Sequence, residues 1–281
     1  MKVVVTGSSG RIGGAIAARL ALRHQVAGVD RRPGALTSLV ADVCDTARIE
    51  PLLAGADAVV HTASLHVPDL AAHGPAEFRA VNVDATRRLL QAAGEAGISS
   101  FVYTSTTSLY GDAMLPESGE AAWVTEALAP RPRDIYDETK LAAEAACEQA
   151  ARAGLACTAM RMSRCFPEEP RLVAVYRLYR GVGAEDVAQA HELALAPGRS
   201  GYEVYNVSTP TPFKRADCRR LFEDAAAVIV ERHPWAEAEF QSRGWLLPRS
   251  IDRVYVVDKA MAGLGYRPVQ DFAALFRRPP A

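Results

Sequence analysis

Residues 2–13 read Lys-Val-Val-Val-Thr-Gly-Ser-Ser-Gly-Arg-Ile-Gly, and this stretch decides the fold. A short β-branched run leads into glycines at positions 7, 10 and 13, and a helical pattern of apolar residues follows. A second apolar run, from Gln25 to Val29, ends at Asp30. The opening of the chain is therefore predicted to form a strand, a glycine-rich turn, a helix and a second strand.

The three glycines have separate physical roles. Gly7 permits the tight turn, Gly10 lets backbone N–H groups approach a pyrophosphate at the helix N-terminus, and Gly13 lets the helix pack closely on the strand. Because tight turns recruit glycine in any case, the spacing alone is weak evidence for a nucleotide site. Asp30 strengthens it, since a carboxylate at the end of the second strand can accept both hydroxyls of an adenosine ribose.

The charge of Asp30 favours NAD over NADP, because a carboxylate repels a 2′-phosphate. Arg31 and Arg32 argue the other way, since either guanidinium can reach a phosphate. If both arginines are instead solvated charges in a surface turn, they do not contact a phosphate. The sequence predicts NAD and leaves NADP as the alternative.

The alternation of strands and helices continues along the chain. Further strands are expected at 39–41, 58–61, 101–104, 156–162 and 202–207, and helices around 46–54, 76–96, 135–153, 185–196, 214–232 and 258–263, with a short segment at 172–180. Repeated βα units predict an α/β fold whose parallel sheet is covered by helices on both faces. The proline-bearing residues 112–134 are predicted as a long loop.

Two groups of polar residues can carry chemistry. Tyr136 and Lys140 lie four apart on a predicted helix, so the phenol and the ammonium share a face. A nearby positive charge favours the phenolate, which is expected to lower the tyrosine pKa as a general base requires. The hydroxyl-rich run 103–108 follows the fifth strand, at the sheet edge where open α/β sheets bind ligands. The Tyr136 and Lys140 spacing by itself is common by chance. A run of hydroxyl residues by itself also occurs in solvated turns.

With these motifs in order, the chain resembles the extended short-chain dehydrogenase/reductase family, the NAD-dependent epimerase/dehydratase group. The resemblance extends over nearly the whole length. Beyond the motifs above it rests on Asp42-Val43, His61-Thr62-Ala63, Asn82 with Ala85-Thr86, Tyr110-Gly111, Arg161 with Pro167, Glu185-Asp186-Val187-Ala188, Tyr205-Asn206 and Asp258-Lys259-Ala260. It implies a Rossmann-type doubly wound parallel sheet with a small discontinuous C-terminal substrate lobe. Residues 1–165 would bind NAD, with 185–208 returning to that domain, and 166–184 and 209–281 would form the lobe.

The resemblance also implies the site. The catalytic residues would be Thr106, Tyr136 and Lys140, with Thr106 in the position of the family's catalytic Ser/Thr. The cofactor contacts would be Gly7, Ser9, Gly10, Arg11, Ile12, Gly13, Asp30, Arg31, Asp42, Val43, Thr62, Ala63, Ser64, Asn82, Tyr136 and Lys140. The substrate contacts would be Ser64, His66, Thr106, Thr107, Arg164 and Arg171.

The stretch after the sixth strand departs from members that act on nucleotide-sugars. Those members have an Asn-x-Tyr-Gly-Pro pattern and a long nucleotide-binding segment there, whereas here only 14 residues separate Pro170 from Glu185. The shortened stretch, with its Cys-x-Pro-Glu, is similar to that of uronate dehydrogenases, which oxidise free sugar acids at C1. By that similarity Arg171, with Arg164 nearby, is the nearest match to a carboxylate-binding arginine, and a guanidinium suits a carboxylate bidentately. Each of the two arginines is equally consistent with a solvated charge in a loop.

Composition and charge exclude several classes of protein. The 32 Lys and Arg balance 33 Asp and Glu, so no basic excess exists to drive binding to nucleic acid. No run approaches about 18 apolar residues and no signal peptide is evident, so no membrane partner and a cytoplasmic location are expected.

Neither a disulfide framework nor a metal site is expected. The odd number of cysteines, five, without a Cys-x-x-Cys pair indicates reduced thiols. His61, His66 and His73 have the composition of a metal cluster, but His61 ends a strand in the family's pattern and the others lie in an irregular loop. No metal is expected.

The sequence predicts an NAD-dependent oxidoreductase acting on a small polar substrate, a sugar or sugar acid. One alternative is a sugar or nucleotide-sugar epimerase/dehydratase with tightly bound NAD. Another is a nonenzymatic NAD-binding regulator, which the complete Thr106, Tyr136 and Lys140 set disfavours. Helices corresponding to 76–96 and 135–153 form dimers in the family, so a homodimer is expected. The substrate and the physiological direction cannot be named from the sequence.

Overall fold

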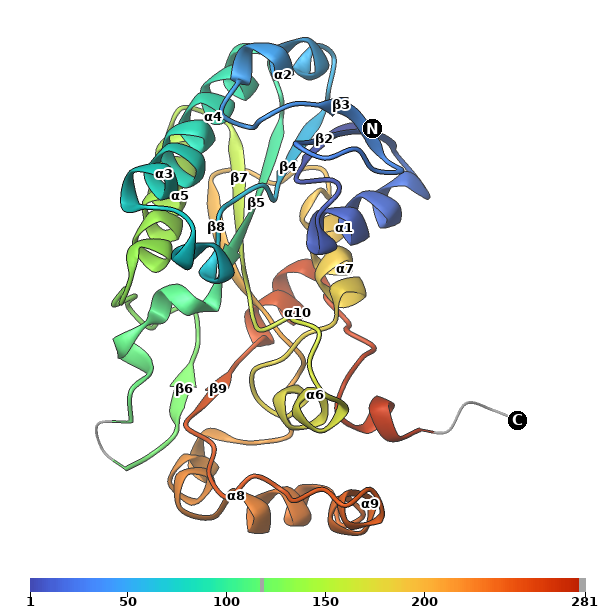
Figure 1. The fold of residues 1–281 in the computed structure, drawn as a ribbon, viewed down its shortest axis with the longest axis vertical. Coiled ribbons are helices and arrows are strands. Elements are labelled where there is room, and N and C mark those ends of the chain that lie inside the picture. The colour runs from blue at the N-terminus through green and yellow to red at the C-terminus, as the bar shows by residue number, and fades with distance from the viewer. Residues whose placement is uncertain (117–118, 278–281) are drawn as a thin grey trace.

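The computed structural model describes residues 1–116 and 119–277. Seven parallel strands form one sheet in the order β3-β2-β1-β4-β5-β7-β8 (Figure 1). They are β1 (Lys2–Thr6), β2 (Gln25–Asp30), β3 (Thr37–Val40), β4 (Ala58–His61), β5 (Ser100–Thr106), β7 (Ala156–Met162) and β8 (Tyr202–Val207). The chain winds outward from β1 to β3 and then returns to β4, so the strand order reverses between β1 and β4. The predicted α/β fold with a Rossmann-type doubly wound parallel sheet is confirmed.

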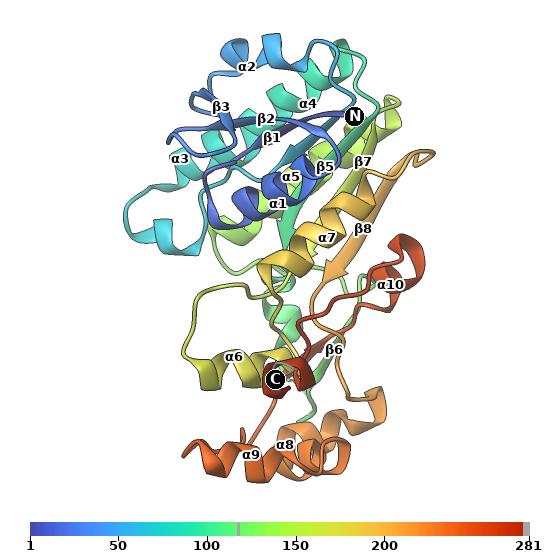
Figure 2. The same ribbon diagram turned by 90° about the vertical axis from the view of Figure 1, so that its right-hand side faces the viewer.

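Helices cover both faces of the sheet (Figures 1 and 2). On one face α1 (Arg11–Ala21) packs against α7 (Ala184–Ala194), and the other face is covered by α2 (Thr46–Leu53), α4 (Ala85–Glu95) and α5 (Ile135–Arg152). The alternation of strand side chains decides the layers, since Val3 and Val5 join the α1 cluster and Val4 joins the opposite one. Among the described residues, no helix is long and apolar enough to cross a membrane.

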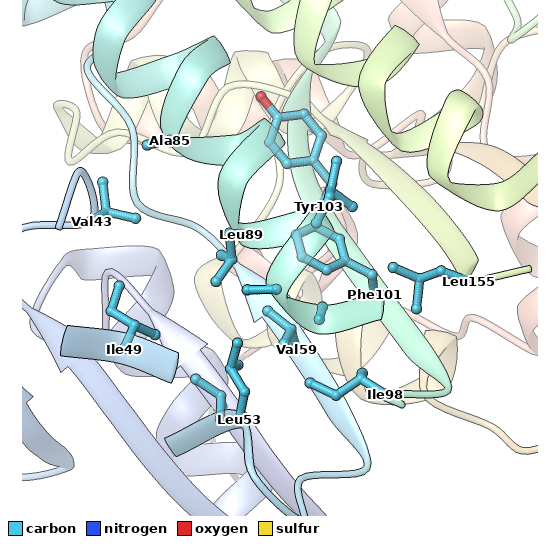
Figure 3. Close-up of a cluster of buried hydrophobic side chains, with 14 of the residues drawn as sticks. Val43, Ile49, Leu53, Val59, Ala85, Leu89, Ile98, Phe101, Tyr103 and Leu155 are labelled. Carbon is cyan, nitrogen blue, oxygen red and sulfur yellow. The ribbon is translucent and has the colours of Figure 1, made fainter. Parts of the chain in front are cut away.

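The cluster on the α2, α4 and α5 face is built from branched and aromatic side chains (Figure 3). Ile49 and Leu53 of α2 meet Leu89 of α4 over Val59 and Phe101 of the sheet, and all five are buried completely. Because both faces of the central strands are covered in this way, the carboxyl ends of the strands are the part of the sheet left for ligands.

The helix expected at 76–96 is interrupted. It begins as α3 (Pro75–Arg79), continues through a π-helical turn at Ala80–Asp84 and ends as α4. The π turn buries Asn82, which hydrogen-bonds the backbone of Leu65 instead of following the helix face. A π turn inside a helix often lies beside a functional site.

A second group of elements lies beyond the carboxyl end of the sheet (Figure 1). Strands β6 (Ala122–Val124) and β9 (Arg253–Tyr255) pair in parallel, and α6 (Pro170–Arg177), α8 (Cys218–Arg232) and α9 (Ala236–Ser242) pack around them. Short 3-10 segments cover Val67–Ala71, Thr107–Tyr110, Asp112–Met114, Arg215–Asp217 and Ala273–Phe276. We call β6, β9, α6, α8 and α9 the lobe.

The lobe differs from the expected boundaries at two places. Residues 112–134, predicted as a loop of the first domain, contain β6, which pairs with β9 from a distant part of the chain. Helix α10 (Asp258–Leu264) was expected in the lobe, but Ala260 and Leu264 pack in the α1 and α7 cluster. A three-residue strand and a seven-residue helix carry too few positions for a periodic pattern, so long-range packing places them.

Replacing Gly13 by alanine is expected to destabilise the fold. A Cβ at Gly13 would lie 2.0 Å from the Gly7 carbonyl oxygen and 2.6 Å from Thr62 Oγ1. We expect a loss of about 1–3 kcal/mol in the free energy of unfolding, the usual range for overpacking. Gly14→Ala is the matched control, because its Cβ would meet only the Ser8 carbonyl oxygen at 3.4 Å. Urea unfolding of both variants tests this, and equal stability would contradict it.

Candidate active site

A cavity of about 1040 Å³ lies at the carboxyl ends of the sheet strands. Its wall includes the turn after β1, the residues after β4 and the ends of β2 and β5, so it spans the point where the strand order reverses. Open α/β sheets bind ligands at that point. The volume is at the upper end of the ~300–1,000 Å³ typical of small-molecule pockets, which suits a dinucleotide with a second small molecule.

The glycine turn fits a pyrophosphate. Gly7 has a φ of +74°, and Gly13 lies directly against the Gly7 carbonyl, so both are needed by the turn itself. A Cβ at Gly10 would meet only the Gly7 carbonyl oxygen, at 3.2 Å, and otherwise open space on the cavity side. No side chain caps the N-terminus of α1. The free N–H groups of its first turn can therefore receive an anion.

Asp30 is held at the cavity wall by two backbone groups. Its carboxylate accepts the Ser9 N–H at 3.0 Å and the Arg32 N–H at 2.9 Å. The Ser9 hydroxyl donates to the Arg32 carbonyl at 2.8 Å, and Ser9 itself does not line the cavity. Ser9, expected as a cofactor contact, instead positions the carboxylate that faces the ribose site.

Asn82 is also placed behind the cavity wall. Its Oδ1 accepts the Leu65 N–H at 2.8 Å and its Nδ2 donates to the Leu65 carbonyl at 2.9 Å. The structure therefore does not support Asn82 as a direct cofactor contact, because its amide already holds the segment after β4. The other predicted cofactor residues line the cavity, namely Gly7, Gly10, Arg11, Ile12, Gly13, Asp30, Arg31, Asp42, Val43, Thr62, Ala63, Ser64, Tyr136 and Lys140.

Thr106, Tyr136 and Lys140 come together at the end of β5. Tyr136 lies in the first turn of α5, which Asp134 caps by accepting the Asp137 N–H at 2.9 Å. The Thr106 hydroxyl accepts the Ser108 N–H at 3.1 Å and lies near enough to the Tyr136 phenol to influence its pKa. Lys140 Nζ donates to the Thr104 carbonyl at 2.6 Å. All three predicted catalytic side chains face the cavity.

Burial dominates the protonation of this set. It raises the pKa of Tyr136, while the neighbouring Thr106 hydroxyl lowers it in part. The expectation that Lys140 lowers the Tyr136 pKa is therefore wrong for this arrangement, because Lys140 Nζ is directed to the Thr104 carbonyl and burial dominates the Tyr136 pKa. Burial lowers the pKa of Lys140 to about 7, against an opposing effect of Glu144.

The substrate end of the cavity differs from the sequence prediction in its arginines. Ser64, His66, Thr106, Thr107 and Arg164 line it. Arg171 does not, because it lies at the start of α6 and its Nε donates to the Leu246 carbonyl at 3.0 Å. The structure therefore does not support Arg171 as the substrate arginine.

The sequence did not predict three further arginines that line the substrate end of the cavity, Arg133, Arg180 and Arg253. Arg133 pairs with Asp137 and Arg253 with Asp252, while Arg164 pairs with Glu168. Arg180 forms no ion pair with any described residue, and its buried Nε has no hydrogen-bond partner there. Its guanidinium lies 5.1 Å from the Tyr176 ring centroid. No local motif marks Arg180, since the lobe brings it to the cavity.

His66 is the other notable side chain at this end. Its ring lies 6.4 Å from that of Tyr136 and 5.9 Å from that of Phe166, measured between centroids. Burial lowers the pKa of His66. A neutral His66 ring can donate or accept a hydrogen bond beside the Tyr136 phenol.

His61 is part of the core. One ring nitrogen is 2.6 Å from Thr6 Oγ1 and the other 2.9 Å from Thr86 Oγ1, and burial lowers the His61 pKa to about 3. All five cysteines are free thiols. Within residues 1–116 and 119–277, no group of three or more His, Cys, Asp or Glu could hold a metal ion.

The buried Lys140 predicts a pH dependence of stability. Its pKa falls from 10.5 to about 7 on folding, so between these values the unfolded chain holds a proton that the folded chain releases. The folded state is therefore stabilised as the pH rises through this window. Relative to Lys140→Met, wild type should gain about 2 kcal/mol in the free energy of unfolding from pH 7 to pH 9. Urea unfolding at both pH values measures this, and a constant difference would contradict it.

Comparison with known proteins agrees with this geometry. Residues 3–173, more than half of the chain, match the model of the NAD dependent epimerase/dehydratase family. A dTDP-glucose 4,6-dehydratase of Streptomyces antibioticus is 30% identical over 268 residues, covering 85% of this chain and 73% of that protein. A 3-beta-hydroxysteroid dehydrogenase of Mycolicibacterium neoaurum is 32% identical over 162 residues, covering 51% of this chain and only 41% of that protein.

A solved structure shows the same fold. MoeE5 in complex with UDP-glucose and NAD superposes with a TM-score of 0.71 at 23% identity, covering 98% of this chain and 96% of that one. The family match and the similarity to the dehydratase along most of both chains carry the assignment, and the fold agrees with it. The chain belongs to the NAD dependent epimerase/dehydratase family, whose members are enzymes of the extended short-chain dehydrogenase/reductase type.

Proposed function

We propose that the protein is an NAD-dependent dehydrogenase that interconverts a hydroxyl and a carbonyl group on a small polar substrate, a sugar or sugar acid. The observation that carries the proposal is that Tyr136, Thr106 and Lys140 line one cavity, with the Thr106 hydroxyl close enough to lower the Tyr136 pKa. A buried phenol next to a second hydroxyl is suited to orient a substrate hydroxyl and to exchange its proton.

Each side chain has a separate role in the proposed reaction. In the oxidative direction Thr106 hydrogen-bonds the substrate hydroxyl and Tyr136 Oη takes its proton. Burial disfavours the resulting phenolate, and the neighbouring Thr106 hydroxyl offsets this in part. NAD, when bound, supplies the hydride acceptor. In the reductive direction the raised pKa of Tyr136 keeps the phenol protonated, so that it can donate to the carbonyl oxygen.

The cofactor end of the cavity accommodates NAD by its own residues. The first turn of α1 would receive the pyrophosphate and the Asp30 carboxylate would accept the ribose hydroxyls. Lys140 would bind the nicotinamide ribose, as the family resemblance implies. Dimerisation through α4 and α5 and a cytoplasmic location remain predictions of the sequence.

We further propose that the lobe binds the substrate and that the substrate is anionic. Arg253 and Tyr255 of β9 and Arg180, which follows α6, reach the cavity from the lobe. Because Arg180 has no carboxylate partner among the described residues, a substrate carboxylate would supply one. Arg180 takes the role that the sequence suggested for Arg171.

The similarity to a dTDP-glucose 4,6-dehydratase favours a second candidate, a nucleotide-sugar epimerase/dehydratase. Eliminating water requires an acid and a base in addition to Tyr136. Among the described cavity residues the carboxylates are Asp30 and Asp42 at the cofactor end and Asp69, whose Oδ2 accepts the His66 N–H at 2.8 Å. The short α6 connection also leaves little chain to enclose a nucleoside. The first feature disfavours a dehydratase, and the second disfavours any enzyme of nucleotide-sugars, so the dehydrogenase is preferred.

Turnover of a substrate panel tests the proposal. With NAD, sugar acids should give net NADH, and Tyr136→Phe should bind NAD normally but lose at least about 10²-fold in turnover. Tyr202→Phe is the matched control, because the buried Tyr202 hydroxyl has no hydrogen-bond partner among the described residues and lies outside the cavity. If UDP-sugars or dTDP-sugars are converted without net NADH and sugar acids are not, the nucleotide-sugar alternative replaces the dehydrogenase.

Asp30 should determine the choice of cofactor. Its carboxylate repels a 2′-phosphate, so wild type should bind NAD more tightly than NADP. Asp30→Asn should shift the ratio of the two dissociation constants at least about tenfold toward NADP, since like charges in contact cost several kcal/mol. Asp42→Asn, at the same end of the cavity, should shift it much less. Isothermal titration with both cofactors measures the ratio. An unchanged ratio in Asp30→Asn would show that Asp30 does not determine the choice, and equal or tighter binding of NADP by wild type would show that Arg31 or Arg32 dominates.

A further inference from the structure

A second, smaller pocket of about 150 Å³ adjoins the main cavity. Arg11, Arg164 and Phe166 line both spaces, and Glu168, Tyr176 and Arg177 complete the polar and aromatic wall of the smaller one. We propose that this side pocket is a separate oxyanion site that binds a phosphate or carboxylate group through Arg177 and Arg11. The site does not depend on the reaction proposed above.

Arg177 is the strongest observation for the site. It lies at the end of α6 with 9% of its surface exposed, yet its guanidinium forms no hydrogen bond or ion pair with any described residue. Its Nε is buried without a partner. A buried charge without a counterion is unfavourable, and buried charges in proteins are paired as a rule. An anion in the side pocket would supply the missing partner.

The nearest acid does not fill this role. Asp186 influences Arg177 through space, but its two oxygens accept the N–H groups of Val269 at 2.9 Å and Gln270 at 3.1 Å. The pair makes no ion contact within 4 Å in the described part of the chain. Asp186 is therefore committed to the chain that follows α10, and Arg177 faces the pocket.

The charge and size of the pocket select the ligand. Three guanidinium groups face it against one carboxylate, Glu168, which pairs with Arg164. Arg11 forms no ion pair with a described residue, so two cations are left for an anion. The volume is well above the ~10–15 Å³ that one water needs and far below a nucleoside pocket. A tetrahedral oxyanion or a carboxylate fits these limits.

The anion has two possible sources. It can be a charged group on the substrate, which would reach from the main cavity past Phe166, or a free inorganic anion. Both would use the same guanidinium groups. Inhibition kinetics distinguish them, because phosphate should compete with the substrate in the first case and not in the second.

Inorganic phosphate is the probe that tests the site. With NAD saturating and ionic strength held constant with sodium chloride, phosphate should raise the thermal unfolding midpoint of wild type. Arg177→Met should weaken phosphate binding at least about tenfold, as expected when charge-assisted hydrogen bonds are lost. Arg171→Met, on the same helix but outside the pocket, should keep the phosphate response.

The thermal unfolding midpoint measured without phosphate shows whether Arg177 has a structural role apart from binding. Because Arg177 leaves no partner behind, Arg177→Met should unfold at the same temperature as wild type or higher. A lower midpoint would show a structural role and overturn the proposal, as would a full phosphate response in Arg177→Met. If phosphate binds without NAD but not when NAD is saturating, it occupies the position of the cofactor's pyrophosphate. That outcome would also overturn the proposal. Arg177→Lys, which keeps the charge, should retain part of the response.

Discussion

The close approach of the first helix to the first strand is the constraint on which the site depends. Gly13 lies against the Gly7 carbonyl, and the Gly7 N–H donates to the Val29 carbonyl at 2.7 Å. The same turn places the Ser9 N–H on Asp30. Thr62 completes this set by donating from Oγ1 to the Thr6 carbonyl at 2.6 Å. Three neighbouring strands thus end at fixed distances around one glycine turn.

A buried polar network holds α5 in register with the sheet. Glu144, one turn beyond Lys140, pairs with Arg161 of β7 at 2.7 Å and accepts the Ser105 hydroxyl at 2.5 Å. Arg161 also donates to the Tyr110 hydroxyl, which donates to Asn206 of β8. Burying an ion pair adds little net stability, but breaking one is costly, so such a network favours a single arrangement. The position of Tyr136 relative to Thr106 follows from it.

The two ends of the main cavity are built differently. The cofactor end uses backbone groups and short side chains of consecutive βα units, which adjacent strands bring together. The substrate end is assembled from β5, the connection after β7 and β9, and it carries several guanidinium groups. Most of these have a carboxylate partner, whereas Arg180 and Arg177 have none among the described residues. At this end of the cavity and in the side pocket, Arg180, Arg177 and Arg11 are therefore the arginines left without a carboxylate partner in the described part of the chain.

Local patterns in the sequence were sufficient for the sheet, the glycine turn and the shared face of Tyr136 and Lys140, because each depends on residues close together in the chain. The tertiary structure alone decided which arginines reach the cavity. Arg171 and Arg177 lie on one helix, and the packing of α6 in the lobe turns the first toward Leu246 and the second toward the side pocket. It also decided that Asn82 and Ser9 support the wall rather than form it, and that burial raises the Tyr136 pKa. Desolvation and the orientation of a helix depend on contacts between distant segments, which no local spacing encodes.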